Sequence, residues 1–147
     1  MYQVGSNGVL PTGTAPQLAQ VPITILPGFN TAPASLPTNP ATSVFPFGLW
    51  FAGATPLYVC DEGDPQVLTS LAGLQKWRLA NGMWTMLYVL RDGLNIGQPY
   101  SVANYPTSLN PATSGCRNII GHHNTDGTVS VYAVTSTISA NGDNGPT

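Results

Sequence analysis

Two short apolar runs lie on either side of a tight stretch of four residues, Gly53-Ala54-Thr55-Pro56. The first run reads FGLWFA and the second reads PLYVC, and neither contains a charged residue. Glycine and proline between two apolar runs mark a turn. The segment therefore predicts an antiparallel hairpin with strands at residues 48–52 and 57–61.

A second turn signal follows in the same part of the chain. Residues 74–79 and 83–91 flank Ala80-Asn81-Gly82. Asn-Gly is the strongest short hairpin signal, because both residues tolerate a positive φ. The two hairpins together predict that residues 47–91 form one four-stranded antiparallel meander in sequence order.

The loop between these hairpins carries helix signals. Asp64 suits a helix cap and Gly73 suits a helix end, so one or two helical turns are expected there. Residues 1–20 are small and polar and are expected to be loose. Three further strands are predicted, at residues 21–26, 117–123 and 128–135, the last two forming a hairpin around Asn124-Thr125-Asp126-Gly127.

Charged residues are sparse, with 4 basic and 6 acidic side chains among 147 residues. Four scattered cations do not form the basic surface that a nucleic-acid binder needs. No apolar stretch approaches the ~20 residues of a membrane-spanning helix, and no export signal is present in the chain. The 16 Gly and 14 Pro, with so little charge, favour an all-β, loop-rich protein of extracellular type.

Polarity increases from the first pair of strands to the second. The first two strands are apolar throughout, which predicts that Trp50, Phe51, Leu57 and Val59 are buried. The next two mix in polar residues (Gln75, Lys76, Arg78 and Thr85). Inner strands covered on both faces are typical of a β-propeller blade. A small β-sandwich with hairpins packed face to face is the alternative.

Five segments carry a resemblance to known proteins: VPITILPGF, FPFGLWFAGATPLYVCDEGD, AGLQKW, LNIGQPY and RNIIGHHNTDGTVSVYAVTSTISANGD. The chain from residue 21 on resembles a family of secreted, largely uncharacterised bacterial β-propeller-type proteins. The resemblance implies a fragment of about one and a half blades: a complete blade at about 47–91 and a half blade at about 117–135, within a partial propeller at 21–147. Cys60, Cys116 and His122-His123 depart from the family pattern, so the resemblance assigns them no role.

Carboxylates gather where the second strand ends. Asp61, Glu62 and Asp64 fall within four residues, and Asp92 lies on a loop expected on the same side of the blade. Several oxygen ligands suit Ca²⁺, although the spacing matches no known calcium loop. The plainer interpretation is a solvated strand end with Asp64 capping a helical turn. We therefore expect no cofactor, with Ca²⁺ as the alternative.

Cysteine, histidine and tryptophan offer weaker candidates. Cys60 and Cys116 are compatible with one disulfide or with two buried thiols. His122 and His123 point to opposite faces of a strand, which disfavours a zinc site. The three tryptophans suit the core better than a sugar-stacking platform; they are Trp50, Trp77 and Trp84.

These patterns favour a binding or scaffold module over an enzyme. Its expected partners are an unknown protein or carbohydrate ligand, and either the remaining blades of the same propeller or further copies of the chain, because sheet faces of an incomplete propeller would be bare. The alternative is a propeller hydrolase of phytase or lactonase type, with a metal held by the loop carboxylates.

Overall fold

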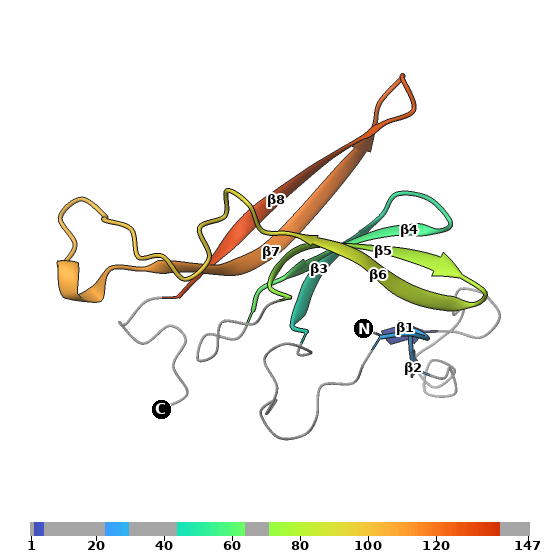
Figure 1. Cartoon of the computed structure of the whole chain (residues 1–147), viewed down its shortest axis with the longest axis horizontal. Helices are drawn as coiled ribbons and strands as arrows, with labels where there is room; N and C mark the ends of the chain where they lie inside the picture. Colours follow the sequence, from blue (N-terminus) through green and yellow to red (C-terminus); the bar gives the residue numbers. More distant parts are fainter. Residues whose placement is uncertain (1, 5–22, 30–43, 64–70, 139–147) are drawn as a thin grey trace, which may run out of the picture.

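A computed structural model describes residues 2–4, 23–29, 44–63 and 71–138 of the chain (Figure 1). These residues form an all-β fold with one short 3₁₀ turn, which confirms the predicted class. The elements are β1 (Tyr2–Val4), β2 (Ile23–Ile25), β3 (Pro46–Phe51), β4 (Pro56–Asp61), β5 (Gly73–Ala80), β6 (Met83–Leu90), η1 (Thr107–Leu109), β7 (Ala112–His123) and β8 (Val129–Ile138).

The central feature is an antiparallel sheet of four strands in the order β3-β4-β5-β6. This confirms the predicted meander. Asn81 and Gly82 connect β5 to β6 with φ angles of 52° and 75°, which is the left-handed conformation that an Asn-Gly hairpin turn requires. Each strand therefore pairs with its neighbour in sequence.

The second hairpin, β7–β8, forms a separate two-stranded ribbon. It is longer at its base than the predicted 117–123 and 128–135, because β7 begins at Ala112 and β8 ends at Ile138. Two register shifts, between Thr113 and Gly115 and between Cys116 and Asn118, allow the ladder to continue past irregular positions. Bulges of this kind leave no clear sequence pattern.

One face of the four-stranded sheet carries the hydrophobic core, and we call it the core face. Its buried members are Phe29, Leu57, Val59, Trp77 and Trp84. The Phe29 ring stacks on Trp77 with a centroid distance of 4.1 Å. The backbone N–H of Trp84 donates to the Pro27 carbonyl at 2.9 Å. The segment after β2 thus covers the β5–β6 side of this face.

The opposite face, which we call the ribbon face, is crossed by β7 over β3 and β4 (Figure 1). The backbone approach is close at Gly48, which lies against the Arg117 carbonyl, and at Gly121, which lies against the Trp50 ring. A Cβ at either position would overlap these atoms. Both glycines therefore let the ribbon lie directly on the sheet.

Burial differs between the first two strands. Leu57 and Val59 in β4 are fully buried, as predicted. The prediction was wrong for Phe51, which is 46% exposed, and Trp50 is only partly buried. Within the part of the chain that the structure describes, β4 has a strand on each side and cover on both faces, whereas β3 pairs with β4 alone.

Two sequence expectations fall largely outside the described residues. Of the expected helical turns, positions 64–70 are not described, and Gly73 already opens β5. Of residues 1–20, only 2–4 are described, and they form β1, which pairs with β2. Within the described part of the chain, no helix has the length and apolar character to cross a membrane.

Candidate functional site

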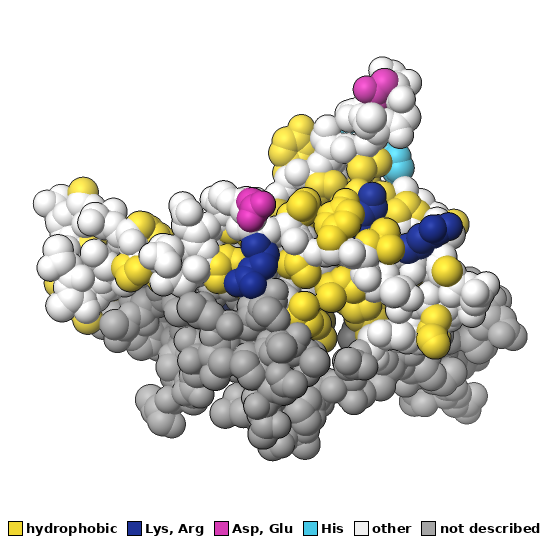
Figure 2. Space-filling view, viewed as in Figure 1, with side chains coloured by type: hydrophobic (Ala, Val, Ile, Leu, Met, Phe, Trp, Pro, Cys, Tyr) yellow, Lys and Arg dark blue, Asp and Glu magenta, His cyan; other side chains and the backbone are white. Residues whose placement is uncertain are grey.

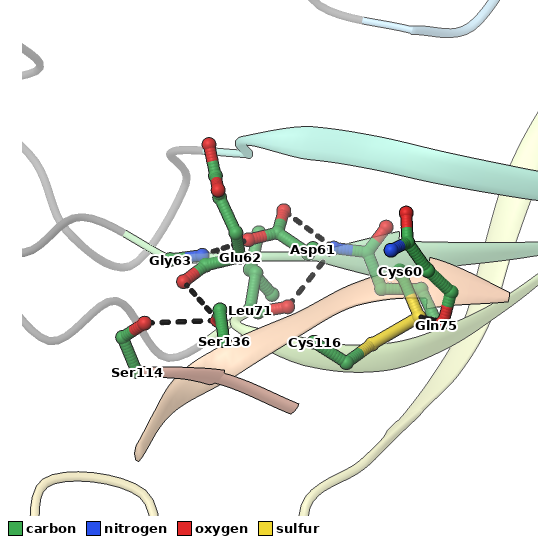
Figure 3. The surroundings of a disulfide bond; sticks show 10 residues. Cys60, Asp61, Glu62, Gly63, Leu71, Gln75, Ser114, Cys116 and Ser136 are labelled. Atoms are coloured by element: carbon green, nitrogen blue, oxygen red, sulfur yellow. Dashed lines mark hydrogen bonds between the residues drawn. A yellow bond between two sulfur atoms is a disulfide. The ribbon is translucent and has the colours of Figure 1, made fainter. Parts of the chain in front are cut away.

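Asp61, the first of the predicted site residues, is the last residue of β4 and is fully buried. Its Oδ2 accepts hydrogen bonds from the Phe45 N–H at 2.7 Å and the Gln75 amide at 2.9 Å. Its Oδ1 accepts from the Gly63 N–H at 2.9 Å. The interpretation as a solvated strand end was therefore wrong for Asp61 (Figure 3).

Gln75 extends this network into the core. Its amide nitrogen also donates to the Leu71 carbonyl at 2.9 Å, and its carbonyl oxygen accepts from the Trp77 indole N–H at 2.8 Å. Gln75 is itself buried, and a buried amide is costly unless its donors and acceptor are satisfied. The chain of bonds from Asp61 to Trp77 meets that requirement.

Burial raises the pKa of the Asp61 carboxyl from 3.8 to about 6. The N–H groups of Phe45, Gly63 and Gln75 act in the opposite direction, because they stabilise the ionised form. Desolvation is the larger effect. Asp61 is thus ionised at neutral pH and takes up a proton in mildly acidic solution.

Glu62 is engaged by the ribbon. Arg117 of β7 contacts the Glu62 carboxylate through both Nε and Nη2 at 2.9 Å, and its guanidinium lies 5.0 Å from the Phe47 ring centroid. The Glu62 backbone carbonyl accepts from the Ser136 hydroxyl at 3.1 Å. These contacts fasten the end of β4 to both strands of the ribbon.

The structure describes one of the other two predicted carboxylates. Asp92 is exposed on the loop after β6, and Asp64 lies outside the described residues. Across the described ranges, no three Asp, Glu, His or Cys side chains converge on a point that would hold a metal ion. The expectation of no cofactor, with Ca²⁺ bound by Asp61, Glu62, Asp64 and Asp92 as its alternative, stays a prediction.

A disulfide between Cys60 and Cys116 joins β4 to β7 beside the carboxylates (Figure 3). The two Cα atoms are 5.0 Å apart, a separation that suits a disulfide. Of the two states that the sequence left open, the structure has the cross-link. His122 and His123 pair with Ser130 and Val129, and so occupy opposite faces of the ribbon.

A second constellation lies on the ribbon face, and we call it the aromatic row. Trp50, Tyr58, Lys76 and Tyr88 occupy one cross-strand line through β3, β4, β5 and β6. The Trp50 and Tyr58 ring centroids are 5.9 Å apart, and the Lys76 ammonium lies 5.4 Å and 5.6 Å from the Tyr58 and Tyr88 rings. His123 of the ribbon is 5.5 Å from Trp50.

The row is open at its Tyr88 end. Tyr58 is buried and Tyr88 is 43% exposed. Hydrogen bonding to Tyr58 raises the pKa of Lys76, so its ammonium is charged at neutral pH. An exposed ring beside a fixed cation can stack on a flat or ring-shaped ligand and attract a negative group.

Sequence reasoning did not find this row, although the alternation of side chains along each strand indicates which residues share a face. The core assignment is confirmed for Trp77 and Trp84, each 6% exposed. Trp50 lies on the other face of the sheet. Placing Lys76 between two tyrosines required the register of two strand pairs, β4–β5 and β5–β6, which the sequence does not supply.

Comparison with known proteins gave no match to a protein-family model, to a curated protein or to a solved structure.

Figure 2 shows apolar side chains gathered over the four-stranded sheet, with basic side chains among them.

Proposed function

We propose that this chain is an extracellular binding or scaffold module, built as part of a β-propeller, that binds a carbohydrate ligand on the aromatic row. The observation that carries the proposal is the line from Trp50 to Tyr88, with the Lys76 ammonium between two tyrosine rings. Such a row offers apolar ring faces and one positive charge. A sugar chain bearing carboxylates matches both.

The disulfide supports an extracellular location. Disulfides persist in oxidising compartments and are rare in the cytosol, and Cys60–Cys116 holds the ribbon against the sheet. The propeller assignment is supported by the meander order of the four strands, which is the strand order of a propeller blade. The β7–β8 ribbon packed on β3 and β4 also suits the alternative, a small β-sandwich.

The hydrolase alternative is less favoured. Both Asp61 oxygens accept N–H donors, and Glu62 is paired with Arg117. A metal ion at these carboxylates would compete with those partners. The aromatic row needs no such rearrangement to receive a ligand.

The test is an NMR titration of the intact chain with two probes, a hexamer of galacturonate and the neutral hexamer cellohexaose. We expect the galacturonate hexamer to shift the amide signals of β5 and β6. Tyr88→Ala should weaken its binding at least about fivefold, or about 1 kcal/mol. The matched control is Met83→Ala, which is on the same strand, 53% exposed and outside the row.

The outcomes separate the alternatives. Equal weakening by both variants, or shifts scattered over the surface, would remove the row from consideration. Binding of neither hexamer would contradict a carbohydrate ligand and leave a protein as the ligand to search for. Loss of binding in Lys76→Gln with the galacturonate probe alone would assign the charge recognition to that ammonium.

A further inference from the structure

The hairpin end of the β7–β8 ribbon extends beyond the four-stranded sheet (Figure 1). Among the described residues, β8 has β7 as its single ladder partner. The outward side of the ribbon carries three large apolar side chains that are more than half exposed: Ile120 at 66%, Tyr132 at 64% and Val134 at 62%. An isolated two-stranded hairpin is marginally stable in water and gains stability from more strands, so a further strand would stabilise the end of this ribbon that extends beyond the sheet.

The free edge has a defined hydrogen-bonding pattern. The Asn124 N–H donates to the Thr128 carbonyl at 2.9 Å and closes the hairpin. Antiparallel ladders alternate, so every second residue of β8 counted from Thr128 bonds to β7. The residues between them direct their backbone N–H and C=O groups away from β7, and we call them the edge residues; they are Val129, Val131, Ala133 and Thr135.

Nothing in the composition of this edge protects it from pairing. Natural proteins block edge strands with lysine, proline or inward-pointing charges. Residues 128–138 contain no charged residue and no proline. By contrast, the outer edge of β6 is occupied at Trp84 by the Pro27 carbonyl. With respect to the residues that the structure describes, the β8 edge is therefore unpaired, and it has no like-charge repulsion against a copy of itself.

We propose that β8 pairs antiparallel with β8 of a second copy of this chain about a two-fold axis at Tyr132. In this register all four edge residues form hydrogen bonds between the copies. Val129 then faces Thr135 of the second copy, and Val131 faces Ala133 of the second copy. An antiparallel pair about a two-fold axis is self-complementary. The pairing makes one four-stranded sheet from two ribbons.

The same register joins the apolar surfaces of the two copies. The outward side of the ribbon has a hollow of about 220 Å³. Its lining residues are Asn118, Ile119, Ile120, Tyr132, Ala133 and Val134. With Tyr132 at the axis, the two tyrosines form a direct cross-strand pair. The hollow of one chain then lies beside the hollow of the other, and the apolar surfaces of the two chains become continuous.

This inference goes beyond the proposed binding function, because the aromatic row lies on β3–β6 and shares no residue with β8. Loss of dimerisation and loss of ligand binding are therefore separate results. A variant of the β8 edge that becomes monomeric should still show the Tyr88→Ala effect on the galacturonate hexamer if the proposed function is right.

The test measures mass by light scattering after size-exclusion chromatography over a range of chain concentrations. The intact chain should run at about 31 kDa, twice its 15.4 kDa. Ala133→Pro removes an outward N–H while leaving the bonds to β7, and should run as a monomer. Ala133→Ser keeps the N–H and should stay dimeric. A monomeric parent, or a dimeric Ala133→Pro variant, would overturn the proposal.

A second pair of variants covers the case in which Ala133→Pro fails to fold. Tyr132→Lys places two ammonium groups at the axis and Tyr132→Glu places two carboxylates there, so each alone should be monomeric. Their mixture should run at about 31 kDa, because unlike charges then meet at the axis. A mixture that stays monomeric, or single variants that remain dimeric, would exclude the Tyr132 register.

Discussion

β3 and β4 are neighbouring strands of similar composition with opposite environments. PFGLWF leaves Phe47, Leu49 and Phe51 exposed by 44–55%, whereas PLYVCD leaves Leu57 and Val59 fully buried. β4 lies between two strands, with the Phe29 segment on the core face and β7 on the ribbon face. Apolar sequence thus sets the capacity for burial, and the strand's neighbours decide how much of it is used.

The disulfide is the strongest single link on the β4 side of this comparison. It closes a loop of 56 residues between Cys60 and Cys116. Restricting the unfolded chain in this way is worth about 4 kcal/mol on the loop-entropy model. We expect the Cys60→Ala/Cys116→Ala chain to lose about 2–5 kcal/mol in urea unfolding. A loss below about 1 kcal/mol would show that packing alone holds β7 on β4.

Two leucines compare the strands directly. Leu57→Ala in β4 should cost about 2–5 kcal/mol, because a fully buried leucine leaves a cavity. Leu49→Ala in β3 should cost less than about 1 kcal/mol, since the side chain is 44% exposed. Both are measured by urea unfolding. Equal losses of stability would contradict the comparison and show that Leu49 is buried as fully as Leu57.

Sequence patterns predicted the structure correctly where residues close together in the chain determine it. The Asn81-Gly82 turn and the meander were predicted from residues a few positions apart. The exposure of Phe51 was not, because it depends on Phe29 packing under β5 instead of β3. Likewise, the acidic cluster after β4 was visible, but Asp61 is buried by contacts to Phe45 and Gln75. Long-range contacts of this kind leave no local pattern.

Asp61 makes the stability of the β4 junction depend on pH. Its pKa is raised from 3.8 to about 6 in the folded chain by burial. Below about pH 4 both folded and unfolded chains are protonated, and the stabilising contribution is fully present. As the pH rises towards 6 the unfolded chain loses the proton first, so stability falls, and above about 6 it no longer changes.

A pKa difference of this size corresponds to about 3 kcal/mol. Urea unfolding between pH 4 and 7 measures it, with Asp61→Asn as the control that lacks the titrating group. The variant should also be less stable at every pH, because its amide N–H₂ would face an N–H donor of Phe45, Gly63 or Gln75. The same pH slope in parent and variant would assign the effect to other groups.

Glu62, the next residue, should contribute far less, although it also joins β4 to the ribbon. The side chains of Arg117 and Glu62 are 47% and 31% exposed, and an ion pair in contact with water is worth about 0.2–1 kcal/mol. Glu62→Gln should therefore cost less than about 1 kcal/mol at low salt, and the cost should shrink in about 1 M NaCl because exposed charges are screened.

A double-mutant cycle with Arg117→Met isolates the pair, because methionine retains an apolar side chain over the Phe47 ring. A coupling energy above about 2 kcal/mol, unchanged by salt, would mean that Glu62 belongs with Asp61 in a shielded junction. The boundary between buried and solvent-facing carboxylates would then lie beyond residue 62 and not between Asp61 and Glu62.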